Sequence, residues 1–371
     1  MISFSNINYI PLLCLKPAEM AALEELPKHD KDILFPLISL KKWVNSKTLE
    51  KSFLRINKAI DDRVRLFDLD RAYLRDCQNS NNPSTCESEI LELANPENGY
   101  QNWVKLFESN QNYVPVVQLD NLEELEPQLD GFINLCKPIV IRFEMSGEYS
   151  IDNDDFNFII KLLLNKKKSI SEMLLLFDYG DFTRSHLLNC EKYSLFINKL
   201  SSFFPTAYFS ISGTSFPYKF HGATKGEIPI YERQIFNKVK NHCKEVSLIY
   251  SDRASARAES LNGGGGVPPP RIDYALKNDW RFVRKEFVLG DEHEKERLYK
   301  QAAIEVINSE YWIKDLHLWG TQMIEKTALG DSYAITSANK ATAVRINMHL
   351  YQQLHYGDDI TSLDTDEDWE D

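Results

Sequence analysis

The sequence predicts an α/β fold, a (β/α)8 TIM-barrel-like domain with a C-terminal helical extension and a disordered acidic tail. Short apolar runs rich in β-branched and aromatic residues recur along the chain, and helix-like segments follow them. Buried strands that alternate with helices are typical of a parallel sheet covered on its outer face. Eight such runs occur, at 9–16, 33–40, 64–70, 113–120, 138–144, 173–180, 207–213 and 246–252. Eight is the number of strands in a (β/α)8 barrel.

The segments between the strands support this prediction. Apolar residues follow helical spacing at 49–60, 122–133 and 156–163. An open doubly wound sheet is the rival, but no glycine-rich fingerprint follows the first strand. A ninth apolar run at 280–284 would extend the barrel or cap its mouth, and 298–307 and 338–354 are expected to be helical. We therefore expect a barrel core at 1–293, C-terminal helices packed on it at 294–357, and a tail at 358–371.

Composition narrows the function classes. The chain has 371 residues, of which 43% are hydrophobic and 26% charged, which is ordinary for a globular protein. The net charge is −12, and eight acidic and no basic residues lie at 358–371, which leaves about −4 for the rest. This balance argues against a broad nucleic-acid-binding surface. The tail is predicted to be a disordered solvating end, with partner docking as the alternative.

Cysteine usage and hydropathy predict a cytoplasmic protein. None of the six cysteines forms a CxxC motif, and no histidine cluster accompanies them, so we expect a reducing compartment and no structural zinc. No secretion signal precedes the first strand, and no window approaches the roughly 18 apolar residues of a membrane span. No membrane association is expected.

Polar residues gather where the predicted strands end, which is the functional face of such a barrel. Spacing by two places each pair on one side of its strand, and we expect that side to face the barrel lumen. They are Lys16, Glu19, Asp68, Asp70, Arg142, Glu144, Asp178, Ser210, Ser212, Tyr250 and Asp252. Two interpretations stay open, an ion-pair network that fills the upper barrel and a pocket for a charged ligand. The candidate catalytic residues are Lys16, Glu19, Arg142, Asp178 and Asp252.

The loops that follow the seventh and eighth predicted strands favour binding of an anion. One is the hydroxyl-rich segment 212–217, and the other, at 260–271, joins four glycines to three prolines. Barrel enzymes frequently bind phosphate at these two loops, and glycine lets the backbone approach an anion. Neither segment matches GxxxxGK[ST] or GxGxxG, and an interdomain linker is the alternative for the glycine segment. Candidate ligand-binding residues are Ser212, Gly213, Thr214, Tyr250, Asn262, Gly263, Arg271, Arg284, Trp319 and His349.

The sequence lacks the usual motifs for metal-dependent and nucleophilic catalysis. No HExxH or HxE…PCxxC motif occurs, and the sequence identifies no cofactor. Acidic residues at the strand ends could hold Mg²⁺, but Lys16 and Arg142 would neutralise them, so no metal site is predicted. His349 is predicted to pack within a helix, with a role as pocket acid or base as the alternative. Gly320 is expected to start a helix or to admit close packing.

Several motifs resemble one known family. They are LLCLKPAEMAAL at 12–23, LFDYGDF at 176–182, SISGTSFP at 210–217, YSDRASARAESLNGGGGVPPPRIDYA at 250–275, LHLWGTQMI at 316–324 and RINMHL at 345–350. Together they resemble the beta protein family of phages, satellite phages and bacteria, over nearly the whole chain except the acidic tail. The resemblance implies a barrel-like protein that acts in anti-phage defence or abortive infection, often encoded beside a partner gene. It implies no particular reaction.

The function predicted from these observations is that of a defence-associated sensor or regulator. It would bind a partner protein encoded nearby, or a phosphorylated small molecule, at the barrel mouth. The alternative is a phosphoester or nucleotide hydrolase that uses Asp178 and Asp252 with Arg142. The hydrolase requires an open pocket with at least one carboxylate that is not paired with Arg or Lys.

Overall fold

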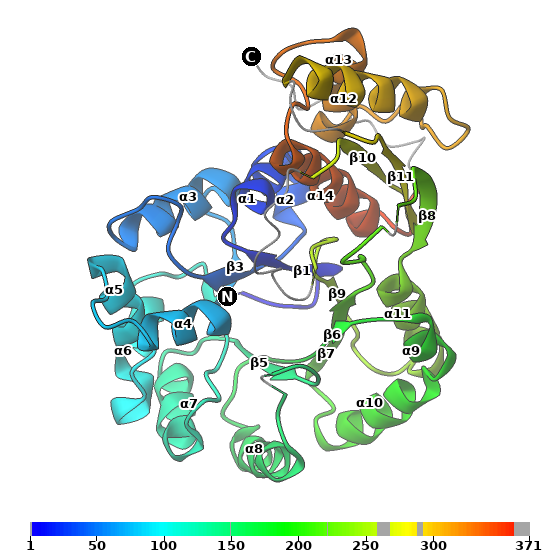
Figure 1. Cartoon of the computed structure of the whole chain (residues 1–371). Helices are drawn as coiled ribbons and strands as arrows, with labels where there is room; N and C mark the ends of the chain where they lie inside the picture. Colours follow the sequence, from blue (N-terminus) through cyan, green and yellow to red (C-terminus); the bar gives the residue numbers. More distant parts are fainter. Residues whose placement is uncertain (1, 149, 221, 258–267, 288–291, 360–371) are drawn as a thin grey trace. The chain divides into compact units, whose positions relative to one another are not determined.

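The computed structural model describes residues 2–148, 150–220, 222–257, 268–287 and 292–359 (Figure 1). The chain forms two compact units. Unit 1 contains Met1–Leu15, Ile33–Gly213 and Glu232–Arg253, and unit 2 contains Lys16–Asp32, Thr214–Tyr231 and Ala254–Asp371. Each unit is therefore assembled from segments that are distant in sequence. The boundary expected at residue 293 rested on element type alone and stays a prediction.

Unit 1 holds all eight strands that the sequence predicts. Within the described residues they are β1 (Tyr9–Cys14), β2 (Leu37–Leu40), β3 (Arg65–Leu69), β4 (Tyr113–Pro115), β5 (Ile139–Glu144), β6 (Met173–Asp181), β7 (Tyr208–Thr214) and β9 (Tyr250–Asp252). They form a five-stranded sheet, β4-β3-β2-β1-β9, and a three-stranded sheet, β5-β6-β7. The ladders within the five-stranded sheet and between β5 and β6 are parallel. The predicted α/β class with parallel strands is confirmed.

A closed eight-stranded barrel is not shown. In the described chain the two sheets meet at their borders through the single bridges Val116↔Val140 and Phe209↔Leu248, and not through a continuous ladder. One physical reason is that β4 ends at Pro115, which has no N–H with which to extend a ladder. The (β/α)8 prediction therefore holds for the succession of strands but not for closure of the sheet.

One apolar core lies along one face of the unit 1 strands. Ile10, Leu66, Val140 and Leu174 belong to it, each from a different strand. The same face continues at intervals of two residues to the polar positions at the strand ends, from Val140 to Arg142 for example. Because residues two apart in a strand share one face, the polar side chains at the strand ends lie on the same face as the apolar core.

Helices connect the strands of unit 1 and lie outside them (Figure 1). The predicted helices at 49–60, 122–133 and 156–163 correspond to α3, η1 with α7, and α8. The full set is α3 (Glu50–Ile60), α4 (Arg71–Gln78), α5 (Thr85–Leu93), α6 (Glu97–Glu108), η1 (Leu122–Glu124), α7 (Leu125–Asn134), α8 (Asn153–Lys166), α9 (Arg184–Leu188), α10 (Glu191–Phe203) and α11 (Tyr231–His242).

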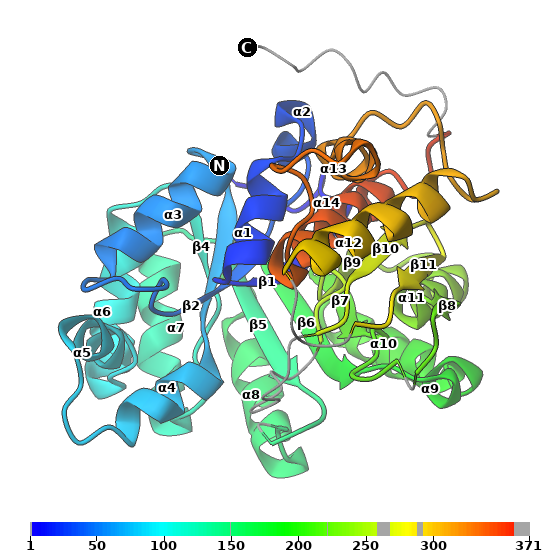
Figure 2. The same cartoon turned by 45° about the horizontal axis from the view of Figure 1, so that its top comes forward.

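Unit 2 combines an antiparallel sheet with helices. β11 (Asp279–Arg284) is the predicted ninth run, and it lies between β10 (Arg271–Ala275) and β8 (Lys225–Pro229). It therefore does not extend the parallel sheets of unit 1. The helices are α1 (Pro17–Glu24), α2 (Lys28–Asp32), α12 (Glu292–Ile307), α13 (Trp319–Leu329) and α14 (Ala338–Leu354). α12 and α14 confirm the helices predicted at 298–307 and 338–354, and α14 lies beside α1 (Figure 2).

Helix α14 is buried along most of its length, including its polar side chains. Asn347 accepts a hydrogen bond from the Gly320 N–H (3.0 Å) and donates to the carbonyls of Ala22 and Glu25 (both 3.1 Å). A Cβ at Gly320 would lie 2.7 Å from the Met348 Cγ and 3.0 Å from the Val344 carbonyl oxygen. Gly320 lies in the first turn of α13 and admits close packing on α14, as predicted.

No helix in the described ranges is long and apolar enough to cross a bilayer. Residues 360–371, which make up most of the predicted acidic tail, lie outside the described residues.

Replacing Gly320 with alanine is expected to lower the free energy of unfolding by about 1–3 kcal/mol, because the methyl group overpacks the α13–α14 contact. Urea denaturation followed by circular dichroism measures the change. Gly357→Ala is the matched control, since a Cβ there meets no atom within 4 Å, and it should change stability by less than about 0.5 kcal/mol. Equal effects of the two substitutions would contradict the packing argument.

Candidate anion-binding site

A cavity of about 750 Å³ lies within unit 2. Among the described residues its lining includes six basic side chains but only two acidic ones, Glu19 and Asp273. The basic residues are Lys16, Lys219, Arg257, Arg271, Arg284 and Arg345. We call this cavity the basic pocket. Such an excess of positive charge in a concave site favours an anionic ligand.

Asp273 is the buried counter-charge of the basic pocket. Its carboxylate is paired with the Arg345 Nη1 at 2.8 Å and with the Arg271 Nε at 2.7 Å. Arg345 also donates from Nε to the Ser255 hydroxyl (3.2 Å). One carboxylate thus serves two guanidinium groups, and a positive charge is left over.

A third guanidinium, that of Arg284, belongs to the residue directly opposite Arg271 in the sheet. Arg271 on β10 pairs directly with Arg284 on β11 in the antiparallel register, so the two side chains project from the same face of the sheet. Like charges directly opposite each other destabilise a sheet. Within the described chain the half-buried Arg284 guanidinium has no acidic partner. A bound anion would remove this repulsion.

The pKa values of the pocket residues also reflect the excess of positive charge. Burial would raise the pKa of Asp273, but the guanidinium groups of Arg271 and Arg345 hold this pKa below its usual range. Burial lowers the pKa of Arg345 to about 10, and repulsion from Arg271 and Arg257 adds to the effect. The pKa of Arg257 is lowered as well, first by burial and then by Arg271.

Aromatic rings hold two of the arginines in place. The Arg345 guanidinium carbon lies 3.8 Å from the Phe216 ring centroid, and that of Arg271 lies 3.7 Å from the Phe220 centroid. Phe216 in turn packs edge-on against Trp280. Stacking on aromatic faces restricts guanidinium groups, so less conformational entropy is lost when they bind a ligand.

Two helix N-termini line the basic pocket. α1 begins at Pro17, and α14 begins after Ser337, whose hydroxyl accepts a hydrogen bond from the Lys340 N–H at 3.2 Å. Pro17 and Ala18 of α1 and Ala338 and Asn339 of α14 belong to the lining. Helix N-termini carry partial positive charge, which favours anions.

Part of the predicted site falls into this pocket. Lys16, Glu19, Arg271 and Arg284 line it together, as do Pro268 and Pro269 of the glycine–proline segment. Asn262 and Gly263 lie outside the described residues. His349 is fully buried and accepts a hydrogen bond from the Trp280 indole N–H (3.2 Å), and Trp319 belongs to the same apolar core as Trp280.

The candidates Arg142 and Asp178 meet in unit 1 in a buried ion-pair network. Arg142 bridges Asp178 (2.7 Å) and Asp68 (2.8 Å), and Arg253 also binds Asp178 at 2.7 Å. The amide of Gln118 donates to the second oxygen of Asp68. Burial would raise the pKa of Asp178, but Arg253 and Arg142 hold this pKa below its ordinary value. Both aspartates are paired, as expected for a network that fills the strand ends.

Tyr250 and Asp252 lie in a separate cluster of unit 1. Tyr9 and Tyr250 donate hydrogen bonds to the two oxygens of Asp252, at 2.6 and 2.7 Å, and their rings stack. Burial, followed by the charge of Asp252, raises the pKa of both phenols. Asp252 thus accepts one hydrogen bond from each of the two phenols.

The hydroxyl-rich loop has local structural contacts. A Cβ on Gly213 would lie 2.5 Å from the Phe182 ring, so packing requires glycine there. The Thr214 hydroxyl accepts from the Phe216 N–H (3.1 Å), and the buried Ser212 Oγ has no hydrogen-bond partner among the described residues. The structure does not bring Ser212 or Thr214 into the lining of the basic pocket.

Sequence reasoning missed Arg257 and Lys219 of the basic pocket, Arg345 as a pocket residue, and Arg253 of the network. Arg345 carried a usable signal, because Arg345, Asn347 and His349 alternate with the apolar residues Ile346, Met348 and Leu350 within one helix. Polar side chains on such a helix must find buried partners. Arg257 lies within the motif at 250–275 but was not singled out there, and Lys219 lies in a loop outside the quoted motifs.

The fold and the pocket define an α/β protein with a cavity lined mainly by basic side chains. A family model described as "Beta protein" matches residues 9–355, and the chain therefore belongs to the beta protein family, as the resemblance of its motifs indicated. The chain is also similar to "Protein beta" of Enterobacteria phage P4. The two sequences are 26% identical over 376 residues, covering 99% of each chain.

Replacing Arg142 with glutamine is expected to destabilise the protein by about 3–5 kcal/mol, because Asp68 and Asp178 would lose their shared buried cation. Chemical denaturation measures the loss. Arg75→Gln removes an ion pair with Glu148 whose side chains are largely exposed, so it should cost less than about 1 kcal/mol. A fully stable Arg142→Gln protein would instead favour an open site at the strand ends.

Acid should destabilise the protein in part through Asp178. Because its pKa is lowered in the folded state, its stabilising contribution is complete above the unfolded value near 3.9 and is lost as pH falls through the lower folded pKa. Asp178→Asn should therefore weaken the dependence of the unfolding free energy on pH between about 2 and 5. Urea titrations at several pH values measure this slope, and an unchanged slope would contradict the assignment.

Proposed function

We propose that this protein is a sensor or regulator that binds a phosphorylated small molecule in the basic pocket. The observation that carries the proposal is the shared counter-charge, since Asp273 pairs with Arg271 and Arg345 while Arg284 and Arg257 line the same pocket. This arrangement is stabilised when an anion enters. The pocket belongs to unit 2, so the proposal no longer depends on the mouth of a barrel.

Phosphate fits the donors better than a single carboxylate does. Guanidinium forks bind phosphate through two parallel hydrogen bonds, and helix N-termini add backbone N–H donors. The volume of about 750 Å³ lies within the range of small-molecule sites and exceeds the need of inorganic phosphate. We therefore expect a ligand of the size of a nucleotide or a sugar phosphate.

The regulatory setting is the part of the proposal that the family resemblance supports. That resemblance implies anti-phage defence or abortive infection, with a partner protein encoded nearby. Binding of a phosphorylated molecule would then report a change in metabolism to the partner. Co-purification of the chain with the product of the neighbouring gene tests this part independently of ligand binding.

The hydrolase alternative has less support. It needs an unpaired carboxylate at the strand ends, whereas Asp68 and Asp178 are paired with arginines and Asp252 accepts two phenol hydrogen bonds. The sensor proposal therefore predicts binding without turnover.

Isothermal titration with nucleoside triphosphates and sugar phosphates tests the pocket, with the unphosphorylated nucleoside as the ligand control. Arg284→Gln and Arg257→Gln should each weaken binding more than tenfold, because a charge-assisted hydrogen bond contributes about 1.5–3 kcal/mol. Arg297→Gln is the matched protein control, since it removes an exposed arginine of unit 2 that does not line the pocket. Absence of binding heat with every phosphorylated compound would overturn the proposal.

A further inference from the structure

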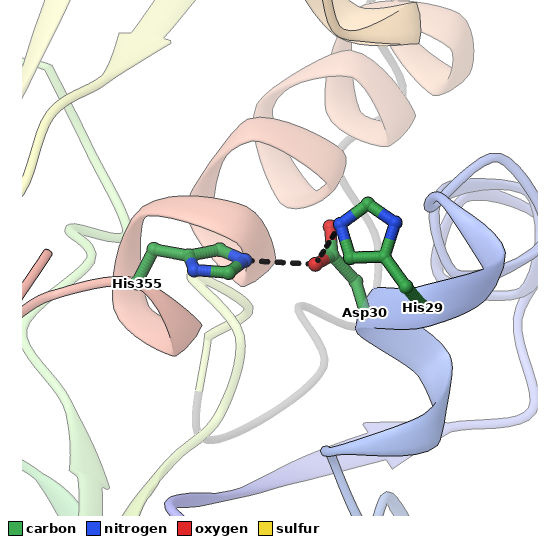
Figure 3. A group of neighbouring side chains, drawn as sticks. All are labelled: His29, Asp30 and His355. Carbon is green, nitrogen blue, oxygen red and sulfur yellow. Dashed lines mark hydrogen bonds and ion pairs between the residues drawn. The ribbon is translucent and has the colours of Figure 1, made fainter. Parts of the chain in front are cut away.

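A second cluster of unit 2 lies outside the lining of the basic pocket. His29 and Asp30 belong to α2, and His355 follows the last residue of α14. Figure 3 shows both imidazole rings directed at the Asp30 carboxylate from its two sides. The His29 Nε2 lies 3.0 Å and the His355 Nε2 2.7 Å from the same Asp30 oxygen. One ligand atom from each residue lies within 4.8 Å of the others.

His355 lies between two carboxylates, one at each ring nitrogen. Its Nδ1 lies 2.8 Å from the Asp358 carboxylate and its Nε2 faces Asp30. A carboxylate can only accept, so a neutral ring that donates from Nδ1 presents the lone pair of Nε2 to a second anion. The contact requires either a second proton or a metal ion between Nε2 and Asp30.

Asp30 supplies an independent observation. Its side chain is fully buried, and its second oxygen, Oδ2, has no hydrogen-bond partner among the described residues. A buried anionic oxygen without a partner is costly. A bound metal ion would provide a partner for this oxygen.

We propose that His29, Asp30 and His355 bind a divalent transition metal, of which Zn²⁺ matches the donors best. Two imidazole nitrogens and one carboxylate are common zinc ligands, and tetrahedral bonds of about 2.0–2.1 Å place donors roughly 3.3 Å apart. The separations of 3.0 Å and 2.7 Å from the Asp30 oxygen would widen by about 0.3 and 0.6 Å to reach this spacing. Water or the second Asp30 oxygen completes the coordination, and Asp358 orients His355 from the second ring nitrogen as carboxylates commonly do at zinc sites.

Such a metal ion would cross-link two helices. It would join α2 to the C-terminal end of α14, whose contacting residues lie 325 positions apart in sequence. A link between distant positions restricts the unfolded chain strongly, so metal binding stabilises the folded state. His29 is 52% exposed, which gives the ion a route from solvent.

Titration of the EDTA-treated full chain with Zn²⁺ tests the proposal by calorimetry and by the rise in melting temperature. Co²⁺ provides a second readout, since its visible absorption reports a nitrogen–oxygen environment. Titrations use a Cys136→Ser background because this cysteine is exposed. We expect one ion per chain, at least 100-fold weaker binding for Asp30→Asn and His355→Gln, and about 10- to 100-fold weaker binding for Asp358→Asn.

The controls separate a metal site from a structural contact. His242→Gln removes an exposed histidine of unit 1 and should leave affinity unchanged. If Asp30→Asn fails to fold, His29→Gln replaces it, because this largely exposed side chain is not needed to fill the core. Equal Zn²⁺ affinity of the parent and His29→Gln, or no one-to-one binding at all, would overturn the proposal.

Discussion

Unit 2 depends on the buried carboxylate of Asp273. It is the counter-charge for Arg345, which is buried within α14, and for Arg271, which is opposite Arg284 in the sheet. Without Asp273, three guanidinium groups would share one region in which burial already lowers the pKa of Arg345 to about 10. With it, the sheet and α14 can pack together while an excess of positive charge stays at the basic pocket.

The buried charges of unit 1 are balanced, whereas those of unit 2 leave an excess of positive charge. This difference bears on function. In unit 1, Asp68 and Asp178 are matched by Arg142 and Arg253, and backbone and amide donors bind the remaining oxygens. In unit 2 the donors outnumber the acceptors. Buried charges that are fully paired are weak evidence for a site, whereas an unmatched cluster in a cavity has capacity for a ligand. The cluster that sequence reasoning considered first as catalytic is thus the better satisfied of the two.

The fold was predictable where it depends on local pattern. Eight apolar runs identified eight strands, and the interval of two placed Arg142 and Asp178 on the face of the inner core. Closure was not predictable, because the borders between the sheets depend on backbone pairing near positions such as Pro115. Arg271 and Arg284 were found through the glycine–proline segment beside them. Arg345 and Asp273 are 72 residues apart, and His355 and Asp30 are 325 apart, so only tertiary packing brings them together.

Helix α14 connects the two candidate sites of unit 2. Its N-terminal residues Ala338 and Asn339 line the basic pocket, and its C-terminal end leads to His355. The helix dipole places partial positive charge at the first end and partial negative charge at the second. The first end therefore favours an anion, and the second favours a protonated imidazole or a metal ion. The direction of one buried helix thus accounts for the sign of the ligand expected at each end.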